Sequence, residues 1–242
     1  MPLYRERKYR RRIKTRDLVS FNVTVKETDL WVSTETDLEQ ETRDLVLNCR
    51  HQLEGYIRSH PRFMTSLQPY PEDPLAPFII RDMIRATAGL GVGPMASVAG
   101  AIAQSIAQDL LKKTKQVIVE NGGDIYLKAN RSTTVSVFAG ESPLSERVGL
   151  KIDPARMPVG ICTSSGTVGH SLSKGGADAV SLLASSAALA DAAATALGNL
   201  IKSPQDLKRA TLWAKGLAGI LGGVIIMGER MVTWGDVELV KL

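Results

Sequence analysis

The chain has 242 residues, of which 44% are hydrophobic and 23% charged, a balance typical of a globular protein with a substantial core. Its net charge is +5, and it has neither an apolar N-terminal signal sequence nor a run of roughly 18 apolar residues that could span a bilayer. Its two cysteines, Cys49 and Cys162, form no CxxC pair. We therefore expect a cytoplasmic protein that needs no disulfide.

Positive charge is concentrated in residues 1–16, which we interpret as a basic arm before a single domain over residues 17–242. Eight of residues 5 to 16 are Lys or Arg. The arm offers only Tyr4 and Tyr9 for stacking on bases, so nucleic-acid binding is less favoured than a solvated arm or a subunit contact. The arm could also attract a phosphorylated ligand.

The first half of the chain is predicted to begin with a β-hairpin and to continue with helices. Residues 18–33 alternate apolar and polar side chains around a turn-prone Glu-Thr-Asp, and residues 38–59 have apolar side chains at helical spacing. Five prolines between residues 61 and 77 indicate an ordered loop. A glycine-rich turn then leads into a long alanine-rich helix, which we expect to start near Pro94 and to end near Lys113.

The second half is predicted to be rich in strands, at residues 117–120, 124–129, 133–139, 148–152, 159–164 and 178–184. Short connections between several of them favour antiparallel neighbours. An alanine-rich helix around Asp191, a second helix over residues 204–215 and a terminal hairpin follow. We therefore expect an α+β architecture, in which helices pack on one face of an antiparallel sheet.

Two polar clusters lie at the ends of predicted strands. The first is Asn121, Gly122, Gly123 and Asp124, where two glycines permit close backbone approach to a ligand. A tight β-turn produces the same residues and is favoured for this cluster taken alone. The second is Thr163, Ser164, Ser165 and Gly166, whose small donors suit a phosphate or a ribose. His170 follows, either as an acid, base or ligand near neutral pH or as a structural or solvated residue.

A third cluster is the pair Asp191 and Thr195, which share one face of the alanine-rich helix because they are four residues apart. One carboxylate and one hydroxyl do not make a structural zinc site, but they suit Mg²⁺, which prefers oxygen ligands. The alternative is that Asp191 caps the N-terminus of its own helix. The helix considered alone favours capping.

Four motifs follow one another as in the ApbE family of FAD:protein FMN transferases. Residues 100–109 (GAIAQSIAQD) resemble the family's G-A/G-I-A-K-G-Y-A-V-D helix, and residues 121–125 (NGGDI) its GGD-I/V strand start. Residues 163–166 (TSSG) resemble its T-S-G turn, and residues 191–197 (DAAATAL) are similar to its D-A-x-A-T-A-L helix. His170 falls where the family has a histidine.

The resemblance implies a T-fold-like α+β domain that binds FAD with Mg²⁺. Full ApbE enzymes transfer the FMN half of FAD to a threonine or serine hydroxyl of a partner protein and release AMP. By resemblance, Asp191 and Thr195 would bind the metal between the FAD phosphates, and residues 121–124 and 163–166 would contact the flavin nucleotide. His170 would lie near the reacting phosphate. With the upstream motifs present, metal binding becomes the favoured interpretation of Asp191.

Two departures from the family pattern concern its charged residues. Gln104 stands where the family helix has Lys, and Ser173 stands where an Asp follows the histidine. Loss of a positioned acid–base group costs about 10²–10⁴ in rate. Two interpretations therefore remain, an Mg²⁺-dependent FMN transferase and a catalytically inactive flavin- or nucleotide-binding accessory protein. The chain is similar to a shorter branch of the family, some members of which are associated with sulfur assimilation in anaerobic prokaryotes.

Overall fold

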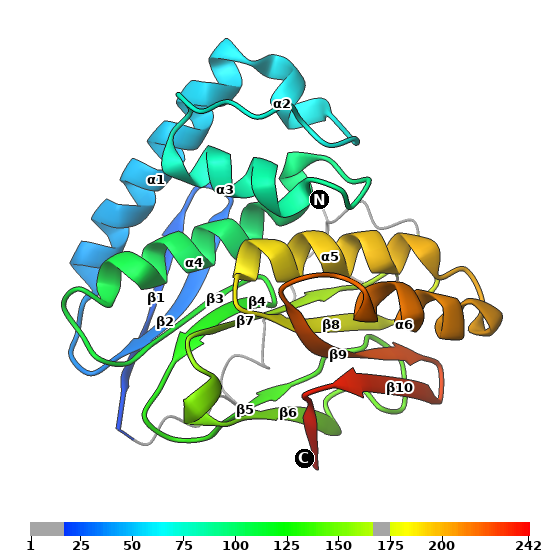
Figure 1. The fold of residues 1–242 in the computed structure, drawn as a ribbon. Helices are drawn as coiled ribbons and strands as arrows, with labels where there is room; N and C mark the ends of the chain where they lie inside the picture. Colours follow the sequence, from blue (N-terminus) through cyan, green and yellow to red (C-terminus); the bar gives the residue numbers. More distant parts are fainter. Residues whose placement is uncertain (1–16, 167–174) are drawn as a thin grey trace.

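A large antiparallel sheet carries helices on one face and a small sheet on the other in the computed structural model, which describes residues 17–166 and 175–242 (Figure 1). Every pairing in the large sheet is antiparallel. In spatial order its strands are β1 (Val19–Val25), β2 (Thr28–Thr34), β3 (Val117–Asn121), β4 (Asp124–Lys128), β7 (Val159–Ser164), β8 (Ala179–Ala184), β9 (Ile220–Met227) and β10 (Arg230–Gly235). The small sheet consists of β11 (Glu238–Lys241), β6 (Val148–Ile152) and β5 (Thr133–Ser136).

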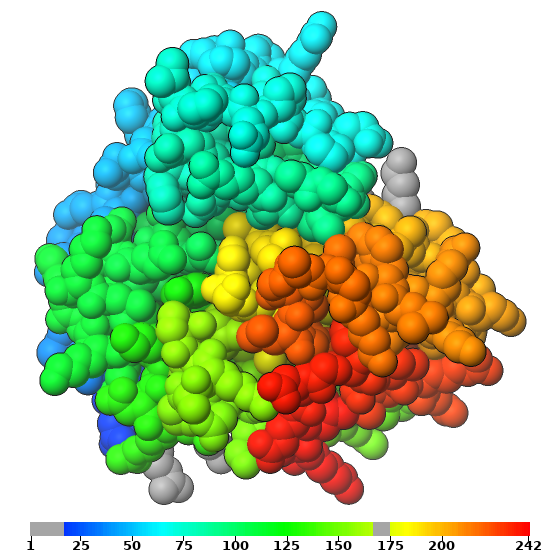
Figure 2. All heavy atoms as spheres, viewed as in Figure 1, coloured from blue at the N-terminus to red at the C-terminus, as the bar shows by residue number. Residues whose placement is uncertain are grey.

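The helices form a layer over one face of the large sheet. They are α1 (Glu39–Ser59), α2 (Pro61–Thr65), α3 (Phe78–Thr87), α4 (Val98–Leu110), α5 (Ala187–Leu200) and α6 (Leu207–Lys215), with short 3₁₀ turns at Pro94–Ser97, Pro154–Arg156 and Pro204–Asp206. α4 packs on β3 and β4, and α5 packs on β7 and β8. The upper part of α1, with α2 and α3, forms the top of the molecule, above α4 and α5 (Figures 1 and 2).

The central strands are apolar on both faces because each face is covered. Side chains that alternate along these strands enter two separate cores. Toward the helices point Val117, Val119, Tyr126, Cys162, Val180 and Leu182, and toward the small sheet point Ile118, Ile125, Leu127, Val159, Ile161 and Leu183. This double burial accounts for the nearly continuous apolar runs in the sequence.

The large sheet is built from two halves with the same order of elements. In the first half the hairpin β1–β2 is followed by helices, including α4, and then by the hairpin β3–β4. In the second half the hairpin β7–β8 is followed by α5 and α6 and then by the hairpin β9–β10. β4 and β7 join the two halves in antiparallel register, with Ile125 opposite Ile161. This duplicated order produces one continuous sheet.

The predicted α+β class and the packing of helices on one face are confirmed, and several local expectations need correction. The first hairpin turns at Lys26 and Glu27, one residue earlier than predicted, and Lys26 adopts a positive φ of 53°. The proline-rich segment contains α2. The predicted terminal hairpin is present as β9 and β10, which turn at Gly228 and Glu229. The last strand is not part of it: β11 leaves β10 and pairs with β6 in the small sheet. The second sheet was not predicted.

Gly160 on β7 lets α5 lie directly on the sheet. A Cβ atom at this position would lie 2.4 Å from the Cα of Ala187, the first residue of α5. Gly100 of α4 makes a similar approach, since a Cβ there would lie 2.3 Å from the Ala187 carbonyl oxygen. Both contacts are with backbone, so a rotamer change cannot relieve them.

Gly160→Ala is therefore expected to destabilise the protein by about 1–3 kcal/mol, the usual cost of overpacking a filled core. The control is Gly55→Ala inside α1, where the nearest atom is a flexible Arg58 nitrogen at 3.7 Å. That substitution should stabilise by about 0.5–1 kcal/mol because Ala is the better helix former. Urea unfolding midpoints measure both, and equal stability of Gly160→Ala and wild type would contradict the close approach.

Candidate functional site

α4 and α5 meet near their N-termini, where each helix supplies a side chain that accepts a hydrogen bond from the other. Asp191 Oδ2 of α5 accepts the N–H of Gly100 in α4 at 2.9 Å. Gln104 Oε1 of α4 accepts the N–H of Ala187 in α5 at 2.7 Å. N–H groups in the first turn of a helix have no intrahelical partner. The two bonds therefore satisfy donors that the helix–helix contact has removed from water.

Asp191 is thus a helix cap, but of the neighbouring helix. The alternative that it caps α5 is wrong, because Ser186 is the N-cap of α5 and its hydroxyl accepts the Leu189 N–H at 3.3 Å. The predicted partner, Thr195, lies one turn further along α5 and is partly buried. The binding of a metal by Asp191 and Thr195 remains a prediction.

The cluster at residues 121–124 forms the tight turn between β3 and β4. Asn121 lies opposite Asp124, and Gly122 and Gly123 both have positive φ, of 69° and 108°. The turn is tied to the helix layer because Asn121 Nδ2 donates to the Ala99 carbonyl of α4 at 3.1 Å. It therefore sits directly beside the N-terminus of α4 and the Asp191 carboxylate that caps it.

Asp124 is buried beside this turn, on the helix-facing side of the sheet. Its Oδ1 accepts the Thr163 N–H at 3.2 Å. Burial raises the pKa of Asp124 to about 7, while hydrogen bonds from Cys162 and Thr163 oppose the rise and the charge of Glu120 adds to it. A carboxyl with this pKa changes its charge close to neutral pH.

Asp124, Asp191 and Cys162 influence one another's protonation. Burial raises the pKa of Asp191 well above its usual range, and the charge of Asp124 raises it further, against hydrogen bonds from Gly100 and Ala99. The pKa of the Cys162 thiol is raised by burial and then by the two carboxylates. The single S–H of Cys162 has a second acceptor within reach, the Ala187 carbonyl oxygen, which lies 3.2 Å from Sγ. Two like charges and a thiol are thus gathered beneath the junction of α4 and α5.

The cluster at residues 163–166 is divided between the two faces of the sheet. The Thr163 hydroxyl pairs with that of Ser181 at 2.7 Å on the small-sheet face, away from Asp124. Ser164 alternates to the helix face, and its buried hydroxyl has no hydrogen-bond partner within residues 17–166 and 175–242. Gly166 donates its N–H to the Ala177 carbonyl at 3.0 Å. Ser165 is partly buried beyond the end of β7.

The structure therefore places Asn121, Asp124 and Ser164 on the helix side of the sheet, where Asp124 interacts with Asp191, and leaves the Thr163 side chain on the other. His170 lies outside the described residues. Across those residues, no group of three or more His, Cys, Asp or Glu side chains is arranged to bind a metal ion. Sequence reasoning missed Cys162, for which alternation along its strand was the available signal. It noted Gln104 only as a departure from the family.

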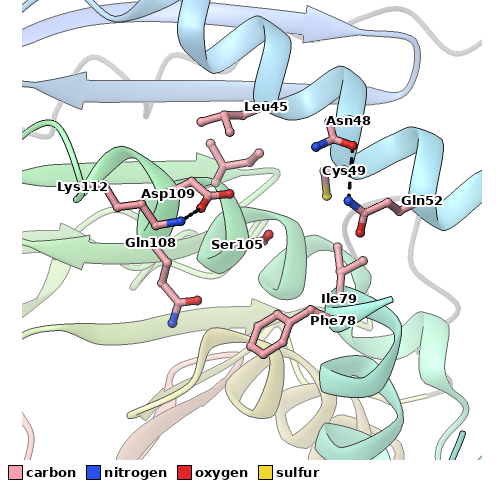
Figure 3. Close-up of a pocket in the computed structure, with 11 residues that line it drawn as sticks. Leu45, Asn48, Cys49, Gln52, Phe78, Ile79, Ser105, Gln108, Asp109 and Lys112 are labelled. Carbon is pink, nitrogen blue, oxygen red and sulfur yellow. Dashed lines mark hydrogen bonds and ion pairs between the residues drawn. The ribbon is translucent and has the colours of Figure 1, made fainter. Parts of the chain in front are cut away.

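A separate pocket of about 400 Å³ lies between α1, α3 and α4 (Figure 3). Its lining comes from the C-terminal part of α4 and from the faces of α1 and α3 toward it, and includes Cys49, Phe78 and Ser105. No residue of the three predicted clusters lines it.

Comparisons with known proteins place these observations in a family. The family model described as AbpE bacteria matches residues 10–216. The chain belongs to this family. It is 39% identical to a UPF0280 protein of Methanococcus aeolicus over 231 residues, which cover 93% of each chain. It is 44% identical to a UPF0280 protein of Methanothermobacter thermautotrophicus over 200 residues, covering 79% of this chain and 76% of that one.

Solved structures of flavin transferases share the fold. The apo form of the Pseudomonas stutzeri flavinyl transferase ApbE superposes with a TM-score of 0.61 at 15% identity, covering 90% of this chain and 94% of that one. The Vibrio cholerae flavin transferase ApbE gives 0.56 at 12% identity, covering 90% and 97%. The predicted ApbE-like fold is confirmed. No helix among the described residues is long and apolar enough to cross a membrane.

Gln104→Lys, which restores the residue of the family motif, is expected to lower the free energy of unfolding by about 1–3 kcal/mol. An ammonium group accepts no hydrogen bond, so the buried Ala187 N–H would be left unsatisfied. Gln205→Lys is the matched control because Gln205 is exposed. Urea unfolding of the two variants measures the difference, and equal stabilities would show that the bond to α5 contributes nothing.

Asp124→Asn is expected to change how stability depends on pH. Because folding raises the pKa of Asp124 from 3.8 to about 7, the folded state binds more protons over this range, and wild-type stability falls as the pH rises through it. Asn keeps a hydrogen-bond acceptor for Thr163 but does not ionise. The variant should therefore gain stability relative to wild type between pH 4 and pH 8, measured by urea unfolding without divalent cations.

The exposed carboxyl of Asp44 on α1 supplies the control for this measurement. Asp44→Asn gives the reference profile for the loss of one exposed carboxyl group. A profile of Asp124→Asn that coincides with that reference would contradict the raised pKa of Asp124.

Proposed function

We propose that this protein binds FAD together with Mg²⁺ at the junction of α4 and α5 and transfers the FMN half to a threonine or serine hydroxyl of a partner protein. The observation that carries the proposal is the pairing of two interacting carboxyl groups, Asp124, which is buried, and Asp191, which is partly buried, beside the N-terminus of α4. Family membership and the fold shared with flavin transferases support flavin as the ligand.

The donor set fits a hard divalent cation. Mg²⁺ is bound by carboxylate and hydroxyl oxygens and shares its coordination shell with substrate phosphates. Asp191 and Thr195 would supply protein ligands from one face of α5. A nearby cation would also favour the charged forms of Asp191 and Asp124, which repel each other when both are ionised. The metal would in turn neutralise the phosphates of the nucleotide.

Neighbouring strand ends supply the remaining contacts of the proposed site. Residues 121–124 and 163–166 lie at the same edge of the sheet because β4 runs antiparallel to both β3 and β7. The Ser164 hydroxyl, buried on the helix side, is suited to a polar group of the nucleotide. We assign His170 to the vicinity of the reacting phosphate, as the family motif implies.

In the proposed reaction the acceptor hydroxyl oxygen forms a bond to the FMN phosphorus. The pyrophosphate bond of FAD breaks, AMP leaves, and the hydroxyl proton is lost to a base or to water. The chain's contribution is to position the phosphates and to offset their charge, which is the main requirement of phosphoryl transfer.

A second candidate function is flavin binding without transfer. Gln104 favours it, because the position that carries a Lys in the family motif is here neutral and bonded to the backbone of α5. The Asp that follows the family histidine is also replaced, by Ser173. Such a protein would serve as a flavin-binding accessory to a partner.

Calorimetric titration with FAD tests the binding site. Wild type should bind FAD more tightly with Mg²⁺ than without it, and Asp191→Asn should lose this Mg²⁺ dependence because the neutral amide lacks the carboxylate charge through which Mg²⁺ is bound. Asn still offers an oxygen to the Gly100 N–H, so the cap of α4 is kept. Asp44→Asn on α1 should bind like wild type. An FAD affinity that changes neither with Mg²⁺ nor with the Asp191 substitution would contradict the proposed site.

A second assay separates transfer from binding alone. The protein is incubated with FAD, Mg²⁺ and a flavoprotein acceptor that carries a target threonine. Release of AMP together with a mass increase of one FMN on the acceptor indicates the transferase. Mg²⁺-dependent FAD binding with neither product indicates the accessory role.

A further inference from the structure

The pocket between α1, α3 and α4 has an apolar floor and an aromatic edge. Buried side chains of all three helices form the floor, namely Cys49, Ile79 and Ile106. The Phe78 ring lies at the edge and is 55% exposed, so part of it is open to a ligand. The Arg81 guanidinium lies over this ring, with its carbon 5.8 Å from the ring centre. A flat apolar ligand would find both a floor and a stacking surface here.

Uncharged hydrogen-bonding groups complete the wall. Asn48 and Gln52 lie one turn apart on α1, and the Ser105 hydroxyl projects from α4 near the middle of the pocket (Figure 3). The two amides share one long bond, from Gln52 Nε2 to Asn48 Oδ1 at 3.3 Å, which leaves further donors of Asn48 and an acceptor of Gln52 for a ligand. Together the three side chains offer both donors and acceptors.

The charges that line the pocket cancel. Asp109 and Lys112 pair with each other at 2.6 Å at one end of it. No other lining residue is charged at neutral pH, and burial raises the pKa of the Cys49 thiol to about 11, which keeps it neutral. The lining residues therefore carry no net charge, and the Arg81 guanidinium lies outside the lining, against the Phe78 ring. The volume of the pocket is near the lower end of the range for ligand sites, about 300–1,000 Å³.

We propose that this pocket binds an uncharged, planar heteroaromatic molecule with an amide-type edge, the chemistry shared by nicotinamide and the nucleobases. The ring stacks on Phe78 over the apolar floor, and the edge exchanges hydrogen bonds with Asn48, Gln52 and Ser105. The site is distinct from the junction of α4 and α5, and its occupancy does not depend on flavin binding.

Nicotinamide is the probe for this site, and saturation-transfer difference NMR is the readout because it detects weak ligands. Wild type should transfer saturation to nicotinamide. It should transfer much less to benzoate, which is planar but charged, and to cyclohexanecarboxamide, which carries the amide but is not planar. Absence of a nicotinamide signal, or equal signals from all three molecules, would overturn the proposal.

Variants locate the bound probe. Ser105→Leu fills the pocket from α4 without weakening the helix, and Phe78→Ala removes the stacking surface, so both should abolish the signal. Leu75→Ala removes a side chain that is 96% exposed three residues from Phe78 and outside the pocket, and it should retain the signal. Asp191→Asn should retain it as well.

A signal that survives Ser105→Leu, or one that Asp191→Asn abolishes, would place the probe elsewhere and overturn the assignment. Unfolding midpoints of every variant are compared with wild type. If Ser105→Leu is destabilised, Phe78→Ala decides, because Phe78 is half exposed and its removal leaves the buried floor intact.

Discussion

The reciprocal pair of hydrogen bonds between α4 and α5 is the constraint on which the candidate site depends. Asp191 reaches the N-terminus of α4 and Gln104 reaches that of α5, so neither helix can move without leaving a buried N–H group unsatisfied. Each such loss costs about 1–3 kcal/mol. Glycines at positions 100 and 160 make the arrangement possible, because any side chain there would strike the backbone of Ala187. The junction is therefore fixed by the fold itself.

This constraint makes the capping role of Asp191 compatible with the metal-binding role that we propose for it. One carboxylate oxygen is fixed by the Gly100 N–H, which sets the position of the group before any ligand arrives. A carboxylate has several acceptor sites, so the same group can still face a cation. Capping and metal binding are alternatives only if the cap belongs to the helix that carries the aspartate. Here Ser186 caps α5, so the Asp191 carboxylate is not needed for that cap and can accept the Gly100 N–H of α4 instead.

How far the sequence could predict this structure depends on how far apart the interacting residues lie. The helices and most strands follow from local periodicity, and the turn at Gly122 and Gly123 follows from backbone freedom within four residues. The bonds at the junction join residues 83 and 91 positions apart, which no local pattern reveals. The small sheet was missed for the same reason, since β11 finds its partner in β6, far upstream in the chain. The family motifs indicated Asp191 as important without showing what it contacts.

The duplicated order of elements explains why only one end of the junction is suited to a cation. α4 and α5 occupy equivalent places in the two halves of the sheet. Gln104 lies four residues after Gly100, whose N–H is bonded by Asp191. Asp191 lies four residues after Ala187, whose N–H is bonded by Gln104. The amide of Gln104 and the carboxylate of Asp191 accept hydrogen bonds from equivalent backbone donors, one in each helix. They differ in charge, however, and Asp124 lies where it raises the pKa of Asp191. Because residue 104 is Gln rather than Lys, both caps are hydrogen-bond acceptors, but ionisable carboxyl groups lie on only one side of the junction, near β4 and β7.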